Sequence, residues 1–244
     1  MFEAHGWGLY PIRAKLTIQS VNQIFPALSA FCKIKNKNVH FTSHIEGFLK
    51  SSNPNMKLGE LFTKYGSDKA TNHNYHLVYQ GILDSINKPA KIFEIGLGTN
   101  NIDIVSTMGK KGRPGASLRA FRDYINIAKV YGADFDKGVL FNENRIKTYF
   151  VDQTSPKTFD ELSKKIGINF DLMIDDGLHS PNANLHSLKF FLTRLKVGGY
   201  AVIEDINPLT KDMWLVVSSI LSNEYLSAFV RTKKACIFVV KKIS

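Results

Sequence analysis

The sequence is poor in cysteine and has no long hydrophobic run. Its two cysteines, Cys32 and Cys236, lie far apart in 244 residues, which argues against a disulfide framework or a multi-cysteine zinc site. The longest apolar stretches, such as CIFVV at 236–240, are far too short to span a bilayer. Residues 1–15 also lack the uninterrupted apolar core of a signal peptide. We therefore expect a cytoplasmic protein without a membrane span.

No stripe of alternating basic and aromatic residues is present, which argues against RNA or DNA as the partner. The formal net charge is nevertheless +11, and small basic clusters lie at 110–119 and 231–234. Such a balance favours anionic partners, for example nucleotide-linked or phosphorylated substrates. A solvated surface that is simply basic explains the charge equally well.

From about residue 90, short β-rich apolar runs alternate with helical patterns. Strands are expected at 90–96, 129–136, 145–152, 170–176 and 200–205, and helices at 116–128, 155–167, 182–199 and around 212–221. Strands separated by helices predict a mostly parallel sheet with helices on both faces. The last two runs, 225–232 and 234–242, alternate apolar and polar residues around a turn and predict an antiparallel hairpin. The expected fold is therefore α/β, with a Rossmann-like seven-stranded sheet that ends in this hairpin.

Residues 1–56 do not follow this alternation. They contain amphipathic pieces and end in the turn-rich stretch SSNPN at 51–55. We interpret them as a small helical appendage that precedes a domain of residues 57–244. The appendage could cap the sheet, form a contact in a homo-oligomer or cover the active site, and the sequence leaves these roles open.

Glycines and carboxylates follow the predicted strands, at the edge where open α/β sheets bind ligands. The first strand runs into EIGLGTNN, in which Glu94, Gly96 and Gly98 allow the backbone to approach a cofactor. Its G-x-G-x-x-N pattern, with the next helix starting only near Gly115, argues against a dinucleotide pyrophosphate site. Asp134, after the second strand, is placed by register to bind the ribose hydroxyls of a nucleoside.

The stretch MIDDGLHS at 173–180 and the end of the next strand contain the other candidate site carboxylates. Adjacent strand ends would bring Asp176 close to Glu204 and Asp205, and converging carboxylates repel one another unless a cation lies between them. Oxygen ligands suit Mg²⁺, and His179 beside that cation could accept a proton near neutral pH. Taken singly, each acid could be a cap and His179 a structural histidine. Taken together, they favour a metal and a general base.

Several motifs occur in the order and spacing of class I S-adenosylmethionine-dependent methyltransferases. They are EIGLGT, GASLRAF, YGADFD, VDQT, DLMIDDGLH and VGGYAVIED. More narrowly, the chain resembles the metal-dependent sugar O-methyltransferases of the mycinamicin and macrocin type. YGSDK and HNY, within 58–83, also match that group, so the resemblance covers roughly residues 57–244.

The resemblance implies an enzyme that transfers the methyl group of S-adenosylmethionine to a sugar hydroxyl with Mg²⁺ bound. The implied cofactor-site residues are Glu94, Gly96, Gly98, Ser117, Asp134 on the ribose, Asp152 and Gln153 by the adenine, and Asp175. The implied metal ligands are Asp176, Glu204 and Asp205, with His179 as the general base. A segment that closes over cofactor and acceptor would contain Tyr65, Asp68, Lys69, His73 and Tyr75.

Two features depart from the family pattern. Leu178 stands where the family often has a small polar residue, and the loop at 98–117 is long. The basic charge leads us to expect a nucleotide-linked sugar acceptor, as in surface-polysaccharide or natural-product glycan synthesis. The same fold acting on another small molecule or on RNA, and a non-catalytic binding protein on that fold, remain alternatives. Asp152 and Gln153 could equally form the N-cap region of the next helix.

Overall fold

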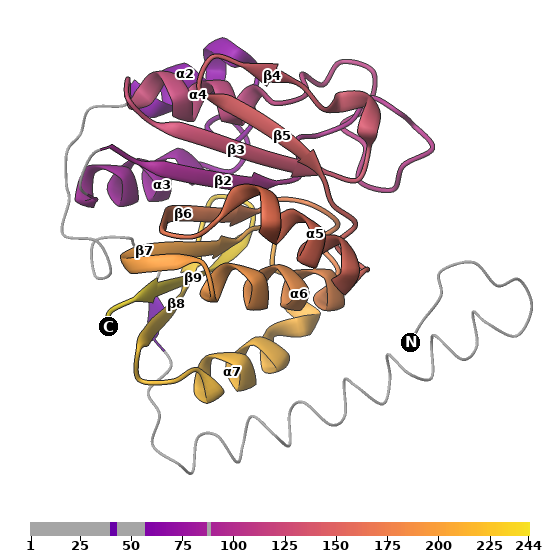
Figure 1. The fold of residues 1–244 in the computed structure, drawn as a ribbon. Coiled ribbons are helices and arrows are strands. Elements are labelled where there is room, and N and C mark those ends of the chain that lie inside the picture. The colour runs from indigo at the N-terminus through magenta and orange to yellow at the C-terminus, as the bar shows by residue number, and fades with distance from the viewer. Residues whose placement is uncertain (1–39, 43–56, 87–88) are drawn as a thin grey trace, which may run out of the picture. The chain divides into compact units, whose positions relative to one another are not determined.

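The computed structural model describes residues 40–42, 57–86 and 89–244 (Figure 1). Its strands are β1 (His40–Thr42), β2 (Lys91–Ile95), β3 (Lys129–Asp134), β4 (Asn142–Glu143), β5 (Ile146–Phe150), β6 (Phe170–Asp175), β7 (Leu195–Ile203), β8 (Tyr225–Arg231) and β9 (Cys236–Lys242). Its α-helices are α2 (Lys57–Tyr65), α3 (Tyr75–Ser85), α4 (Ala116–Tyr124), α5 (Pro156–Ile166), α6 (Pro181–Leu192) and α7 (Lys211–Ile220). Across these residues the strands form one sheet in the order β1-β8-β9-β7-β6-β2-β3-β5-β4.

The predicted sheet is confirmed. β2 pairs in parallel with β3 and β6, β3 pairs in parallel with β5, and β6 pairs in parallel with β7. β9 lies antiparallel between β7 and β8, which is the predicted terminal hairpin. Two short strands extend the edges, with β1 parallel to β8 and β4 antiparallel to β5. β1 lies within the segment 1–56, and the helices expected there fall outside the described residues.

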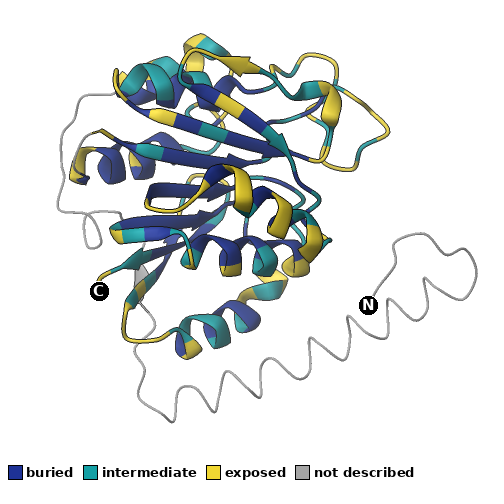
Figure 2. Ribbon diagram, viewed as in Figure 1, coloured by how far each residue is buried: buried dark blue, intermediate teal, exposed yellow. Residues whose placement is uncertain are grey.

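Apolar side chains cover both faces of the sheet. Helices α2, α3 and α4 share one cluster with the strands, in which the rings of Phe62 and Phe121 meet edge to face at 5.3 Å. On the other face, Phe93 of β2 packs against Phe190 and Phe191 of α6. Figure 2 shows β2 and β6 buried along most of their length, between these helical layers. Strands buried on both faces read as continuous apolar runs, which is why the sequence predicted them well.

The helix expected at 182–199 is shorter than predicted, and the strand after it is longer. α6 ends at Leu192, and β7 already begins at Leu195. A register shift interrupts the pairing of β7 with β6. Gly198, with φ at +85°, lies in this irregular part of the strand. The expectation was wrong because a glycine pair is typical of a β-bulge as well as of a helix end.

Asn207–Leu221 belongs to a compact unit distinct from the one that carries the sheet. It contains a short 3₁₀ turn, η3 (Pro208–Thr210), and α7, which confirms the helix expected around 212–221. The side chain of Asn207 accepts a hydrogen bond from the Leu209 N–H and so caps η3. None of the helices in the described part of the chain is long and apolar enough to cross a membrane.

Candidate active site

A cavity of about 540 Å³ lies at the sheet edge where β2, β3, β6 and β7 end. The carboxyl ends of parallel strands lie at the same edge of a sheet, so residues distant in sequence meet there. Of the predicted site residues, its lining contains Lys69, Gly96, Gly98, Ser117, Asp134, Asp176, His179, Glu204 and Asp205. Its lining does not contain Tyr65, Glu94, Asp152, Gln153 or Asp175.

The glycine turn after β2 brings two strand ends into close contact. Gly96 has φ at +91°, and a Cβ there would lie 2.0 Å from the backbone oxygen of Asp176. Gly98 has φ at +78°, and a Cβ there would meet the side chain of Met108 at 2.3 Å. Only glycine fits both the left-handed backbone and the lack of space at Gly96. Close packing within the protein therefore requires glycine at this turn, and both glycines line the cavity.

Asp134 ends β3 and lies in the cavity wall. Its two carboxylate oxygens accept hydrogen bonds from the backbone N–H groups of Leu97, at 2.7 Å, and Asp136, at 2.8 Å. Burial raises the pKa of this carboxyl above its ordinary value. Asp136, by contrast, accepts from the Gly138 N–H and the Thr99 hydroxyl. Each Asp134 oxygen keeps capacity for a further donor, so a ribose diol could bind there.

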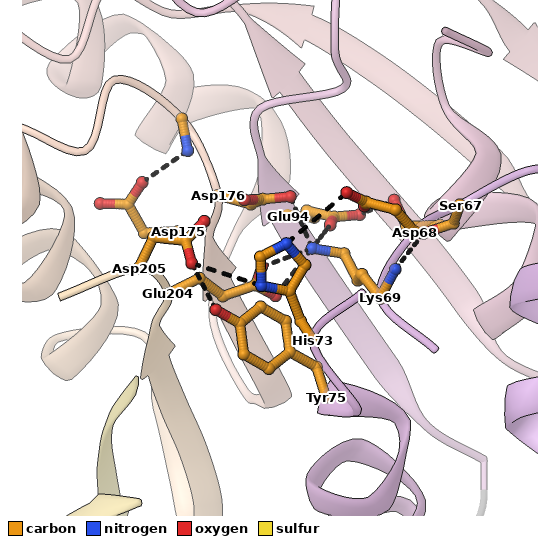
Figure 3. Close-up of polar contacts among 12 residues, drawn as sticks. Ser67, Asp68, Lys69, His73, Tyr75, Glu94, Asp175, Asp176, Glu204 and Asp205 are labelled. Carbon is orange, nitrogen blue, oxygen red and sulfur yellow. Dashed lines mark hydrogen bonds and ion pairs between the residues drawn. The ribbon is translucent and has the colours of Figure 1, made fainter. Parts of the chain in front are cut away.

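A buried lysine holds three carboxylates together. Lys69 is only 3% exposed, and its Nζ lies 2.5 Å from Asp176 Oδ2, 2.7 Å from both oxygens of Glu204 and 3.4 Å from Glu94 Oε1 (Figure 3). Burial lowers the pKa of Lys69, but the charges of Asp176, Glu204 and Glu94 outweigh it and raise the pKa well above its usual value. Lys69 is therefore a resident cation at the base of the cavity.

The two glutamates of this cluster also have hydroxyl partners. Tyr79 donates a hydrogen bond to Glu204 Oε1, and Ser117 donates a 2.5 Å bond to Glu94 Oε2. Burial, more than any other influence, raises the pKa of Glu94 to about 7. Sequence reasoning did not single out Tyr79. Its spacing of four from Tyr75 places both rings on one face of α3, which was the available signal.

A second cluster faces the cavity more openly. His179 Nε2 lies 3.6 Å from Asp176 Oδ1 and 3.7 Å from Asp205 Oδ2. The potential ligand atoms of these three residues all lie within 4.8 Å of one another, a spacing that could hold a metal ion. Among the described residues, the Nδ1 atom of His179 has no hydrogen-bond partner. His179 and Asp205 both have left-handed backbones, at φ +53° and +50°, a conformation that few residues other than glycine adopt, Asp and His more often than most.

Side chains of the segment 66–75 contact carboxylates of both clusters (Figure 3). That this segment closes over cofactor and acceptor stays a prediction. Tyr75 donates a hydrogen bond to Asp205 Oδ1, and the ring of His73 stacks on Tyr75 at 4.9 Å. His73 Nδ1 lies 3.9 Å from Asp205 Oδ1. Tyr65 is not part of this arrangement, because its hydroxyl bonds to Asp123 on α4.

Gln153 and Asp175 lie outside the cavity lining and bond to each other beside the turn after β6. Gln153 Nε2 donates to Asp175 Oδ1 at 2.7 Å, and its Oε1 accepts from the Leu178 N–H at 2.7 Å. Asp175 is fully buried and also accepts from Asn184 Nδ2 at 2.9 Å. Asp152 accepts from the backbone N–H of the residue two further along, which is a local cap. These contacts hold the turn after β6, and the adenine contacts expected of Asp152 and Gln153 stay a prediction.

The long loop between β2 and α4 folds back on itself and supplies cations to the cavity. The amide of Asn100 donates to the backbone oxygens of Gly109, at 2.7 Å, and Gly112, at 2.9 Å. Lys111 and Arg113 both line the cavity. The sequence showed 110–119 as a basic cluster, and the resemblance placed only Ser117 of it at the cofactor site. That Lys111 and Arg113 also line the cavity was not predicted.

Comparisons with known proteins agree with this architecture. The fold is that of a methyltransferase: MycE methyltransferase from the mycinamycin biosynthetic pathway, solved with Mg and SAH, superimposes with a TM-score of 0.60 at 24% identity over 77% of this chain and 55% of that one. The same enzyme solved with Mg, SAH and mycinamycin VI gives a TM-score of 0.61 at 22% identity over 77% and 54% of the two chains. The predicted fold class is confirmed.

Curated proteins similar in sequence are named as sugar O-methyltransferases. The chain is 30% identical to 8-demethyl-8-alpha-L-rhamnosyl tetracenomycin-C 2'-O-methyltransferase of Streptomyces olivaceus over 150 residues. The aligned region covers 61% of this chain and 37% of that protein. It is 31% identical over 126 residues to mycinamicin VI 2''-O-methyltransferase of Micromonospora griseorubida, covering 50% and 29%. The match thus spans about a third of the length of these relatives. No family model matches the chain. The resemblance drawn from the motifs is confirmed as similarity to these enzymes.

Proposed function

We propose that the chain is an S-adenosylmethionine-dependent O-methyltransferase that acts on a sugar hydroxyl with Mg²⁺ bound. One observation carries the proposal: the glycine turn, Asp134 and the Asp176–His179–Asp205 cluster converge on one cavity. The similarity to curated sugar O-methyltransferases supports it. The cavity volume of about 540 Å³ lies within the usual range for small-molecule sites.

The residues present fit the cofactor. Gly96 and Gly98 line the cavity beside Asp134, which offers acceptors for two ribose hydroxyls. Bound S-adenosylmethionine supplies an electrophilic methyl group. The contribution of the chain is to hold the acceptor oxygen in line with that methyl, and such positioning is worth roughly 7–11 kcal/mol in favourable cases.

The residues present also fit a divalent cation. Asp176 and Asp205 present carboxylate oxygens beside His179, and hard oxygen ligands suit Mg²⁺. A bound Mg²⁺ acts as a Lewis acid that makes an acceptor hydroxyl more acidic. Of the three predicted ligands, Asp176 and Asp205 have the more exposed side chains, at 28% and 31%. The third predicted ligand, Glu204, is bonded to Lys69 and Tyr79.

His179 is the proposed general base. The imidazole lies in the cavity lining beside two carboxylates, whose charge would stabilise the imidazolium after it accepts a proton. The turns after β6 and β7 fix the ring and Asp205 relative to each other. The acceptor hydroxyl would therefore be deprotonated at the same end of the cavity where the carboxylates converge.

The cations in the cavity wall support an anionic acceptor. Lys111 and Arg113 line the cavity, and the chain carries a net charge of +11. Guanidinium and ammonium groups are well suited to phosphate oxygens. We therefore place the acceptor among nucleotide-linked or otherwise phosphorylated sugars, as used in surface-polysaccharide or natural-product glycan synthesis.

Calorimetric titration with S-adenosylhomocysteine, with and without Mg²⁺, tests the cofactor and metal steps. We expect the wild type to bind both, and Asp176→Ala to lose the metal site while Asp152→Ala retains it. Cofactor binding without a metal site would leave a metal-free methyltransferase. Absence of cofactor binding would contradict the proposed function.

The acceptor class is tested by methyl transfer to a panel of nucleotide-sugars and matched neutral glycosides. Lys111→Ser and Arg113→Ser should raise KM for the phosphorylated acceptors, and Lys129→Ser, which removes an exposed charge outside the cavity, should not. Equal turnover of neutral and phosphorylated acceptors by all four proteins would contradict the anionic acceptor.

A further inference from the structure

The four carboxylates at the base of the cavity fall into two pairs. The side chains of Glu94 and Glu204 are 0% and 1% exposed, whereas those of Asp176 and Asp205 are 28% and 31% exposed. Lys69 lies against the buried pair and also bonds Asp176. Asp176 therefore belongs to both groups, with Oδ2 on Lys69 and Oδ1 toward His179.

Glu204 has little capacity left for another cation. Both of its oxygens lie 2.7 Å from Lys69 Nζ, and Oε1 also accepts from Tyr79. A carboxylate bound in this way can become a metal ligand only after the ammonium has withdrawn. Oδ2 of Asp176 likewise could bind a metal only after the ammonium, now 2.5 Å away, has withdrawn.

We infer that Lys69 is a built-in counter-ion that competes with the divalent cation for Asp176 and Glu204. The inference rests on the part of the proposed function that places Mg²⁺ at this site. Two cations that share Asp176 repel each other strongly where water is largely excluded. Lys69 thus lowers the affinity of the site for Mg²⁺ and keeps Glu204 from coordinating until it moves away.

The cavity offers the space for that movement. Lys69 lines the cavity, so its ammonium would withdraw from the carboxylates toward that space. The segment that carries it is bracketed by Gly66, at φ +85°, and Asn74, at φ +53°. In this position Lys69 acts on the metal through the carboxylates, so it is a positioning residue.

Calorimetric titration with Mg²⁺ alone tests the inference on wild type, Lys69→Met, Lys69→Arg and the surface control Lys129→Met. Removing the competing charge should tighten Mg²⁺ binding about tenfold or more in Lys69→Met. Lys69→Arg and Lys129→Met should bind no more tightly than wild type. A double-mutant cycle adds the ligand readout: Glu204→Gln should change the affinity little in the wild type and weaken it several-fold in Lys69→Met.

A measurement on the wild type keeps the test independent of whether Lys69→Met folds. Amine acylation followed by peptide mass spectrometry should find Lys69 protected without Mg²⁺ and modified at saturating Mg²⁺, with Lys129 modified equally in both. Lys69→Met binding Mg²⁺ no more tightly than the wild type, or Lys69 staying protected in Mg²⁺, would overturn the inference alone. Binding of S-adenosylhomocysteine but of no Mg²⁺ by any variant would overturn the metal site and this inference, and leave the cofactor site standing.

Discussion

His179 and Asp205 follow neighbouring strands and face each other, with the imidazole Nε2 3.7 Å from the carboxylate Oδ2. Both residues have φ near +50°, so each side chain leaves its turn in a direction that an extended or helical backbone would not allow. No residue in the described ranges forms a hydrogen bond with the imidazole Nδ1. Its placement beside the carboxylates is therefore set by the backbone of the two turns.

Replacing His179 should remove catalysis and leave cofactor binding intact. His179→Ala and His179→Asn are both expected to lose about 10²–10⁴-fold in turnover, the usual worth of a general base. His179→Asn should fold better, because asparagine tolerates the left-handed backbone. Initial rates with saturating acceptor and titration with S-adenosylhomocysteine are the measurements. His186→Asn, outside the cavity, is the control, and wild-type turnover in both His179 variants would exclude His179 as the base.

Gly96 should not tolerate a side chain. Gly96→Ala is expected to cost about 3–5 kcal/mol of unfolding free energy, since the methyl meets the backbone of Asp176 as well as adopting a left-handed φ. Gly109→Ala is the matched control, because Gly109 has φ at +70° and open space around it. That variant should cost only about 1–2 kcal/mol. Equal losses in urea unfolding would mean that the contact with Asp176 does not matter.

Gln153 should prove to be a structural residue. Gln153→Ala removes the amide that bonds Asp175 Oδ1, which keeps the Gly177 N–H, and leaves the Leu178 N–H without its acceptor. This should cost about 2–4 kcal/mol of unfolding free energy. Asp152→Ala removes only a local cap and should cost about 1 kcal/mol. Urea unfolding of both variants measures this. Weaker S-adenosylhomocysteine binding by Gln153→Ala at unchanged stability would instead support the adenine contact predicted from the sequence.

Glu94 should make the protein less stable as the pH rises. Burial raises its pKa from 4.5 to about 7, so between those values the folded state holds a proton that the unfolded state has released. Unfolding free energy should therefore fall across this window, by at most about 3 kcal/mol. Urea unfolding in chelator-containing buffers, compared with Glu94→Gln, isolates the effect. Glu143→Gln is a useful contrast, because the hydrogen bond from Arg119 lowers the pKa of Glu143 and gives its contribution the opposite sign.

The sheet could be predicted from the sequence because its strands are buried. An apolar run such as that of β6 predicts a buried strand whichever helices pack against it. The end of α6 could not be predicted, because Gly198 fits a helix end and a bulged strand equally well. That choice depends on the pairing of β7 with β6, which is a long-range contact.

The convergence of Asp176 and Asp205 could also be predicted, since adjacent parallel strands end at the same edge. The position of Lys69 could not, because it arrives from a segment before the first predicted strand and its partners lie more than a hundred residues away. Motif order placed Lys69 over the site. It did not indicate that the ammonium would lie among the buried carboxylates.

Lys69 is covalently part of the chain, so the buried glutamates have a positive partner from the moment the chain folds. A newly synthesised protein with this arrangement need not wait for metal to reach its native state. In the proposed metal-dependent enzyme, maturation would separate into two events, folding around an internal ammonium and later exchange of that charge for a dissolved ion. Material prepared in a strong chelator is then expected to be native and to gain activity when Mg²⁺ is added.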